Sequence, residues 1–168
     1  MEVIKVKDYG ELSQFAATRI ESQVKRKPAS VLGLATGGTP LGTYKELVKG
    51  YENGNTDYHQ VTTFNLDEYV GLDPEHPQSY HTYMHTHLFN HININPDQIH
   101  LPKGNTRQLA VECKEYEHLI EEVGPPDLQL LGIGENGHIG FNEPGTPFSS
   151  TTHIVDLTTS TKKANARF

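Results

Sequence analysis

The chain of 168 residues has a single cysteine, no excess of basic residues and no long run of apolar side chains. Cys113 has no partner for an intramolecular disulfide, which excludes a disulfide scaffold and is typical of proteins of the reducing cytoplasm. Without a long apolar run the sequence has no candidate membrane span. Its first residues alternate charged and apolar side chains, unlike a signal peptide. We therefore expect a cytoplasmic protein with no membrane partner.

Basic residues are outnumbered by acidic ones: 14 Lys and Arg against 21 Asp and Glu give a formal charge of −7. This balance argues against nucleic acid as the main partner. It leaves room for a small anionic ligand, which a local group of donors is able to hold. The length suits one domain that buries a sizeable core without disulfides or metals. We therefore expect a single domain over residues 1–168 with a small-molecule partner.

Apolar runs that end in glycine-rich turns alternate with amphipathic stretches along the chain. Helical spacing of apolar residues predicts helices over 9–26, 41–48, 79–89 and 109–123. Short apolar or β-branched runs predict strands at 30–35, 61–64, 127–133 and 153–157. This alternation predicts an α/β fold with a mainly parallel sheet and helices on both of its faces. In such sheets, ligands bind beyond the carboxyl ends of the strands.

A glycine-rich turn joins the strand predicted at 30–35 to the helix that follows, with the sequence Leu34-Ala-Thr-Gly-Gly-Thr-Pro40. Gly37 and Gly38 let the backbone approach a ligand closely, and amides at the start of a helix favour phosphate. We expect Thr39 at the N-cap and Pro40 in the first helical turn. The alternative is a tight turn that needs glycine for its backbone angles alone, because the motif lacks the lysine of a P-loop.

Two adjacent carboxylates, Asp67 and Glu68, follow the strand predicted at 61–64. At the end of a strand a carboxylate can face a ligand pocket and act as a base. Capping of the next turn is the alternative use of such a residue. Because neighbouring side chains point in different directions, we expect only one of the two in the site.

The strand predicted at 127–133 leads into a densely polar loop, Gly132-Ile-Gly-Glu-Asn-Gly-His-Ile-Gly-Phe-Asn-Glu-Pro144. Its first six residues match the Gly-x-Gly-x-x-Gly fingerprint of dinucleotide binding, which would indicate an NAD-dependent dehydrogenase. That fingerprint opens a helix, whereas glycine and proline continue the loop here, so we interpret the match as fortuitous. His138 near Glu143 is typical of proton transfer near neutral pH. A histidine hydrogen-bonded for structure is the alternative.

Four segments in order resemble the glucosamine-6-phosphate deaminase family. They are Leu-Gly-Leu-Ala-Thr-Gly-Gly-Thr-Pro at 32–40, Asn-Leu-Asp-Glu-Tyr-Val-Gly-Leu at 65–72, Gly-Glu-Asn-Gly-His-Ile-Gly-Phe-Asn-Glu-Pro-Gly at 134–145 and Thr-Lys-Lys-Ala-Asn-Ala-Arg-Phe at 161–168. The resemblance covers essentially the whole chain. It implies a Rossmann-like three-layer sandwich and, in amino-sugar catabolism, the conversion of glucosamine 6-phosphate and water into fructose 6-phosphate and ammonia. It also implies no metal and no redox cofactor.

The resemblance assigns a role to each matching residue. The residues that it implies for the sugar phosphate are Thr36, Gly37, Gly38, Thr39 and Arg167. Asp67 matches the base that moves a proton between C2 and C1 after the sugar ring opens. His138 matches the acid/base of ring opening, and Glu143 matches the carboxylate that tunes this histidine.

Three positions depart from part of the family. Asn136 stands where some members carry aspartate; asparagine is able to orient the histidine but does not titrate. We therefore expect ring opening with a different pH profile. The allosteric members use basic residues where this chain has His153 and Val155, which argues against activation by N-acetylglucosamine 6-phosphate.

Four histidines, His81, His85, His87 and His91, form two pairs at helical i, i+4 spacing. The two pairs are offset by six residues and no cysteine or carboxylate completes a tetrahedral set, so we favour a solvated or partly packed helix over a metal site.

Two further functions remain open at this point. A 6-phosphogluconolactonase would share a similar fold and phosphate loop, but it hydrolyses an ester and needs no enolising aspartate. A sugar-phosphate-binding regulator would sense the ligand without converting it, although no segment is basic enough for a DNA-binding element.

Members of the resembled family are markedly longer than this chain. The match ends at Arg167 and Phe168, inside the region that forms a mobile lid in the family. We therefore expect a sheet that lacks its C-terminal elements, a phosphate site that lacks a second basic ligand, and weak or absent activity of these 168 residues in isolation. The family includes monomers and larger rings, so self-association is left open.

Overall fold

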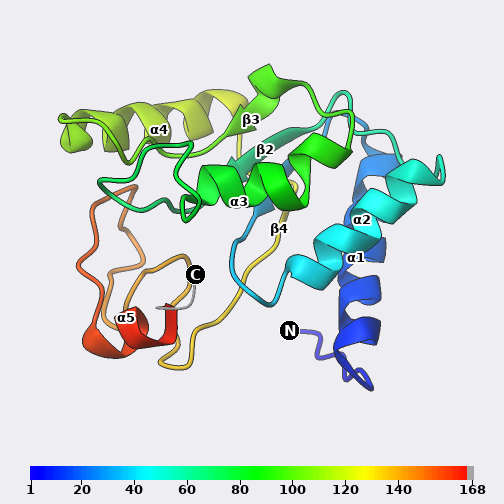
Figure 1. Cartoon of the computed structure of the whole chain (residues 1–168), viewed down its shortest axis with the longest axis horizontal. Coiled ribbons are helices and arrows are strands. Elements are labelled where there is room, and N and C mark those ends of the chain that lie inside the picture. The colour runs from blue at the N-terminus through cyan, green and yellow to red at the C-terminus, as the bar shows by residue number, and fades with distance from the viewer. Residues whose placement is uncertain (166–168) are drawn as a thin grey trace.

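Four parallel strands form the centre of the molecule. The computed structural model describes residues 1–165, and its sheet has the order β3-β2-β1-β4 (Figure 1). The strands are β1 (Val31–Leu34), β2 (Thr62–Asn65), β3 (Ile99–His100) and β4 (Leu128–Gln129). All three neighbouring pairs are parallel, and β1 pairs with β2 from Val31↔Thr62 to Leu34↔Asn65. The polar segments that follow β1, β2 and β4 therefore leave the sheet at the same edge.

Helices connect the strands and lie on both faces of the sheet. The helices are α1 (Tyr9–Arg26), α2 (Leu41–Glu52), α3 (Tyr80–His87), α4 (Leu109–Val123) and α5 (Thr159–Asn165), with short 3₁₀ turns η1 (Phe89–His91) and η2 (Pro96–Gln98). No helix in the described part of the chain is long and apolar enough to cross a membrane.

Side-chain alternation along β1 divides the core between the two faces. Leu32 and Leu34 belong to a cluster with apolar residues of α1, α2 and α3. Val31 points the other way and packs with Phe64 of β2 and Tyr116 of α4. The resulting order, three helices, sheet and α4, is the three-layer α/β sandwich that the sequence predicts.

Local sequence accounts for the ends of the helices. Asp8 caps α1, because its carboxylate accepts a hydrogen bond from the Glu11 amide at 2.9 Å. Ser79 caps α3 in the same way through the Thr82 amide at 3.0 Å. The N-cap of α2 is Pro40, with no side-chain capping bond, so the expectation that Thr39 caps this helix is wrong.

The extent of two predicted strands differs from the expectation. Within 127–133 only Leu128 and Gln129 form a strand with β1, and the last backbone hydrogen bond to β1 is from the Leu130 amide to the Gly33 carbonyl at 2.8 Å. Residues 153–157 form neither helix nor strand. The two-residue β3 is too short to give a pattern in the sequence, and it exists because it pairs with Thr63 and Phe64 of β2.

Candidate active site

Asp67 and Glu68 leave the end of β2 in different directions and have different partners. Both Glu68 carboxylate oxygens accept backbone amides, from Tyr69 at 2.8 Å and Tyr80 at 3.0 Å on one oxygen and from His81 at 2.9 Å on the other. Glu68 therefore holds its own turn against the start of α3. Asp67 accepts no hydrogen bond from residues 1–165. Of the two carboxylates, only Glu68 is thus bound by backbone amides within these residues.

The Asp67 carboxyl group is held in a poorly solvated position. Burial raises its pKa from 3.8 to about 7, and the neighbouring charge of Glu68 adds to the rise. A carboxylate with a pKa near neutrality is able both to take up a proton and to return it at physiological pH.

The loop that follows β4 is organised by hydrogen bonds between its own side chains. Asn136 lies between His138 and Glu143: its Oδ1 is 2.7 Å from His138 Nδ1, and its Nδ2 donates to Glu143 Oε2 at 2.6 Å. Glu143 Oε1 accepts the amide and the hydroxyl of Thr158 at 3.0 and 3.1 Å. The side chain that sequence comparison assigns to tuning the histidine thus acts through Asn136.

This arrangement fixes the protonation pattern of the imidazole. Donated hydrogen bonds lower the pKa of Glu143 to about 2. The largest contribution comes from the Thr161 hydroxyl and the next from the Thr158 amide, while Asn136 and the Thr158 hydroxyl contribute less. An ionised Glu143 only accepts hydrogen bonds, so the Asn136 amide must turn its NH₂ group towards it. The Asn136 oxygen then faces His138 Nδ1, which must donate, so the neutral form of the imidazole has its lone pair on Nε2.

Gly134 makes room for the imidazole. A Cβ atom added there would lie 2.1 Å from Cε1 and 2.3 Å from Nδ1 of His138. An added Cβ at Gly132 meets nothing within 4 Å. No helix follows in 132–158, whereas the dinucleotide fingerprint opens one.

The turn between β1 and α2 contributes backbone amides. Gly37 has φ +108°, and an added Cβ would meet no atom within 4 Å, so its conformation is what requires glycine. Among residues 1–165, no group accepts a hydrogen bond from the amides of residues 36–39. Free amides before a helix N-terminus form a site for an anion.

One cavity of about 290 Å³ brings these three segments together. Thr36 and Thr39 line it from the first turn, Asp67 from the second and His138 from the third, and Asn165 of α5 completes the wall. Asn136 and Glu143 stand behind His138. Arg167, which the resemblance assigns to the phosphate, lies outside the described residues.

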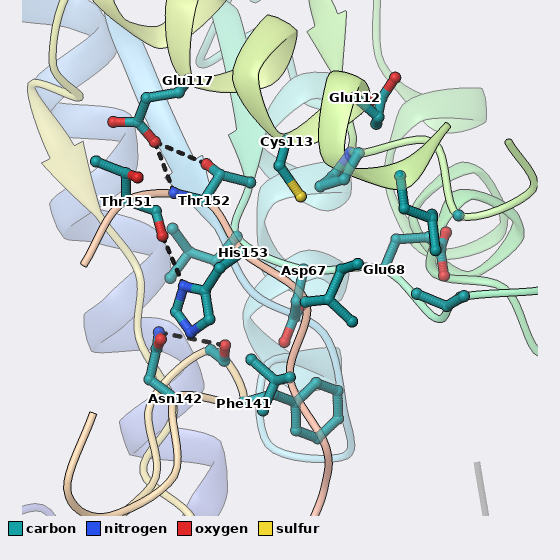
Figure 2. A pocket seen from close by; sticks show the side chains of 18 of the residues that line it. Asp67, Glu68, Glu112, Cys113, Glu117, Phe141, Asn142, Thr151, Thr152 and His153 are labelled. Atoms are coloured by element: carbon teal, nitrogen blue, oxygen red, sulfur yellow. Dashed lines mark hydrogen bonds between the residues drawn. The ribbon is translucent and has the colours of Figure 1, made fainter. Parts of the chain in front are cut away.

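A second cavity of about 360 Å³ lies between α4 and the segment 150–157, and Asp67 also lines it (Figure 2). Figure 2 shows Cys113 of α4 pointing into this space. The segment 150–157 is held to α4 by Glu117, whose Oε2 accepts the Thr152 amide and hydroxyl, both at 2.8 Å. Asp67 thus stands between two cavities, shielded by the chain on either side.

The four histidines of the α3 region face different surroundings. His81 and His85 lie side by side with ring centroids 4.5 Å apart, whereas His87 packs on Tyr83 at 4.7 Å. His91 Nε2 is 2.9 Å from the Thr86 carbonyl oxygen. Within residues 1–165, no group of three His, Cys, Asp or Glu side chains is placed to hold a metal ion.

Sequence reasoning missed the two threonines that support the Glu143 carboxylate. Thr158 Oγ1 accepts the Thr161 amide at 3.3 Å, as an N-cap side chain does at the third residue of a helix. The spacing Thr-x-x-Thr before α5 is a signal that would have predicted this cap. Its link to Glu143 spans 15 residues and is visible only in the fold.

Comparison with known proteins places this geometry among sugar-phosphate enzymes. The family model described as glucosamine-6-phosphate isomerases/6-phosphogluconolactonase matches residues 9–168. A glucosamine-6-phosphate deaminase of Geobacillus sp. (strain WCH70) is 58% identical over 168 residues, which are 100% of this chain and 67% of that protein. Glucosamine-6-phosphate deaminase 2 of Bacillus subtilis (strain 168) is 54% identical over 100% of this chain and 68% of its own length. The chain thus spans about two thirds of these relatives.

Solved structures give the same picture. A monomeric glucosamine-6-phosphate deaminase superposes with a TM-score of 0.98 at 51% identity, over 99% of this chain and 69% of that one. The 6-phosphogluconolactonase of Thermotoga maritima matches with a TM-score of 0.67 at 23% identity, over 80% of this chain and 60% of that one. The second likeness shows a shared fold.

Proposed function

The chain belongs to the family of glucosamine-6-phosphate isomerases and 6-phosphogluconolactonases, and we propose that it acts within it as a glucosamine-6-phosphate deaminase. The reaction is the isomerisation and deamination of glucosamine 6-phosphate to fructose 6-phosphate and ammonia. The observation that carries the proposal is Asp67, a carboxylate that accepts no hydrogen bond within residues 1–165, with a pKa of about 7, in one cavity with His138, Thr36 and Thr39. Hydrolysis of a lactone needs no base that moves a proton between two carbon atoms, whereas an aldose–ketose isomerisation does.

His138 opens the sugar ring in this scheme. Its Nε2 carries a lone pair because Nδ1 donates to Asn136, so Nε2 is able to take the proton of the C1 hydroxyl group and pass it to the ring oxygen. The C1–O bond to the ring oxygen breaks and C1 becomes an aldehyde. The ionised Glu143 keeps Asn136, and through it the imidazole, in this orientation.

Asp67 then moves a proton along the open chain. The carboxylate removes the hydrogen of C2 as the C1 carbonyl becomes an enolate, and the resulting carboxylic acid returns the proton to C1 while a proton of the C2 amino group passes to O1. The product is an imine at C2, which water converts into the ketone of fructose 6-phosphate with release of ammonia. A pKa near 7 suits this double use, because the acid and the base form are of similar energy at working pH.

The phosphate group is assigned to the turn before α2. Thr36, Gly37, Gly38 and Thr39 supply amides and hydroxyls at the positive end of the helix. Arg167 would add a guanidinium fork, a geometry that suits phosphate. Such local donors make an anionic substrate compatible with a chain of formal charge −7.

The finer assignments rest on the family and on composition. We place the protein in the cytoplasm and in amino-sugar catabolism, with a small-molecule substrate, no nucleic acid or membrane partner and no metal or redox cofactor. The reaction as written balances with water alone.

The test is ammonia release from glucosamine 6-phosphate by the parent and by Asp67→Asn. The variant keeps the shape of the side chain but removes the base, so we expect turnover to fall by about a thousandfold or more. Glu68→Gln is the matched control: it removes a charge one residue away, from a side chain that binds only backbone amides, and should keep most of the activity.

Two results would contradict the proposal. Near-normal turnover by Asp67→Asn would remove the role given to this residue. A parent enzyme that hydrolyses 6-phosphogluconolactone and releases no ammonia from the amino sugar would assign the chain to the lactonase branch.

A further inference from the structure

Tyrosine hydroxyl groups from neighbouring helices hold the carbonyl oxygens of the turn between β1 and α2. Tyr44 of α2 donates to the Ala35 carbonyl and accepts the Ala35 amide at 3.2 Å. Tyr83 of α3 donates to the Gly37 carbonyl at 2.6 Å. The rings of these two tyrosines meet edge to face, with centroids 6.5 Å apart. The turn is thus anchored from the side of α2 and α3.

A third tyrosine reaches the same turn from α1. The Tyr9 hydroxyl lies 2.8 Å from the Thr39 carbonyl oxygen and 3.2 Å from that of Gly38, and it accepts the Gly42 amide at 2.8 Å. A Cβ atom at Gly42 would stand 3.0 Å from the Tyr9 ring, so glycine at this position allows the close approach.

These contacts decide which way the amides of the turn point. The C=O and N–H groups of a planar trans peptide face in opposite directions. With the Ala35, Gly37 and Gly38 carbonyls turned towards the tyrosines, the N–H groups of the following residues, Thr36, Gly38 and Thr39, point away from them. Thr36 and Thr39 line the cavity that also holds Asp67 and His138.

We propose that Tyr9, Tyr44 and Tyr83 are positioning residues that preset the amides of Thr36, Gly38 and Thr39 for the phosphate group of the substrate. This inference rests on the proposed function, since the phosphate is that of the sugar. The physical gain is preorganisation: a turn with Gly37 and Gly38 at its centre has many backbone conformations, and the hydroxyls hold one of them before the ligand arrives.

Two properties suit the hydroxyls to this task. Burial raises the pKa of both Tyr44 and Tyr83 well above the ordinary value, so both stay O–H donors at any physiological pH. Neither of these two hydroxyls adds a negative charge near the anion. The amides that they direct have no protein acceptor within residues 1–165.

Tyr83→Phe is the sharpest test, because it deletes one hydroxyl and keeps the ring packing. Losing one hydrogen bond from the Gly37 peptide should raise the KM for glucosamine 6-phosphate by about three- to tenfold, with kcat within about twofold of the parent. The dissociation constant of inorganic phosphate, titrated calorimetrically, should rise by the same factor. A role confined to stability would move the unfolding temperature and leave phosphate affinity unchanged.

Two further variants complete the experiment. Tyr9 is half-exposed, so Tyr9→Phe leaves the core intact. This variant should weaken phosphate binding by about twofold. Tyr58→Phe is the matched control, a buried tyrosine whose hydroxyl has no partner within the described residues; it should bind phosphate like the parent.

Parent-like phosphate affinity in both Tyr83→Phe and Tyr9→Phe would overturn the inference, and so would an equal loss in Tyr58→Phe. Failure of the proposed function is separate. It would show as a parent that releases no ammonia, while the phosphate titrations would still test the tyrosines.

Discussion

Two carboxylates of the site, Asp67 in the turn after β2 and Glu143 in the loop after β4, are placed in opposite surroundings. Asp67 has no hydrogen-bond donor among residues 1–165, and burial raises its pKa to about 7. Glu143 accepts bonds from Asn136 and Thr158, and its donors lower its pKa to about 2. The same functional group is thus prepared for proton transfer in one region and kept as a fixed charge in the other.

The difference shows how a fold assigns roles. Desolvation disfavours the charged form of a carboxyl group, while donated hydrogen bonds favour it. Asp67 gains the ability to exchange a proton because its surroundings supply no donors. Glu143 loses that ability but becomes a permanent acceptor, which sets the orientation of Asn136 and the tautomer of His138.

Of the variants considered in the loop after β4, Gly134→Ala should cause the largest loss of activity. Its added Cβ would stand 2.1 Å from the His138 ring, so the imidazole must move. Because a displacement of about 1 Å in a catalytic group costs about 100-fold in rate, we expect a loss of this size in kcat for ammonia release.

Gly132→Ala is the control for that variant. It makes the same change two residues earlier, where an added Cβ meets nothing within 4 Å, so turnover should stay close to that of the parent. Equal losses in both variants would show that the loop needs glycine for a reason other than the space of the imidazole.

Asn136→Asp should make the loop after β4 resemble the turn after β2, where two carboxylates are neighbours. The new carboxylate would replace an amide nitrogen 2.6 Å from Glu143 Oε2, and two negative charges at that distance share a proton. The pair should therefore bind a proton well above pH 2, and the pH dependence of kcat/KM should gain an ionisation that the parent lacks.

The double variant Asn136→Asp with Glu143→Gln tests the cause of that change. It restores one neutral and one charged side chain, so its pH profile should return towards that of the parent. Identical pH profiles for the parent and Asn136→Asp, measured from pH 5 to 9, would argue against the coupling.

Asp67→Asn should raise the thermal stability of the protein at high pH. The folded-state pKa of about 7 lies above the ordinary value of 3.8, so the parent loses stability as the pH rises between these values, because the folded state still holds a proton that the unfolded state has already released. We expect an increase in Tm on the order of 5 °C at pH 8 and none below pH 4.

Glu143→Gln should shift Tm in the other direction at pH 8. The depressed pKa of Glu143 means that its ionised form contributes stability above pH 4.5 and loses it as the pH falls towards 2. Shifts of the same sign in the two variants, followed by thermal denaturation from pH 3 to 8, would refute the contrast between the two carboxylates.

Much of the fold is predictable because it depends on local pattern. The helix at Tyr9–Arg26 agrees with the predicted 9–26, and the strands at 31–34 and 62–65 agree to within one residue at most ends. The strand predicted at 153–157 is wrong, and that at 127–133 is shortened to Leu128–Gln129. A strand exists only where a neighbour pairs with it, and the neighbour is set by the tertiary fold.

The candidate site is also predictable in part, because the residue types of its loops are visible in the sequence. The residue types at 36–39, 67, 138 and 143 indicate phosphate binding and proton transfer, and a family resemblance assigns their roles. That Glu68 caps α3, and that Asn136 connects Glu143 to His138, depends on contacts which no spacing in the sequence shows.

The sequence by itself determined where most helices and strands form and which chemical groups three loops offer. It also determined the acidic balance of the chain and its single cysteine. The tertiary structure decided which groups share a cavity, which carboxylate has no hydrogen-bond donor among residues 1–165, and which way the amides of Thr36, Gly38 and Thr39 point. The physical reason is that pKa values and peptide orientations follow from burial and from hydrogen-bond partners distant in the chain. Tyr83 and Gly37, 46 residues apart, meet only once α3 has packed beside α2.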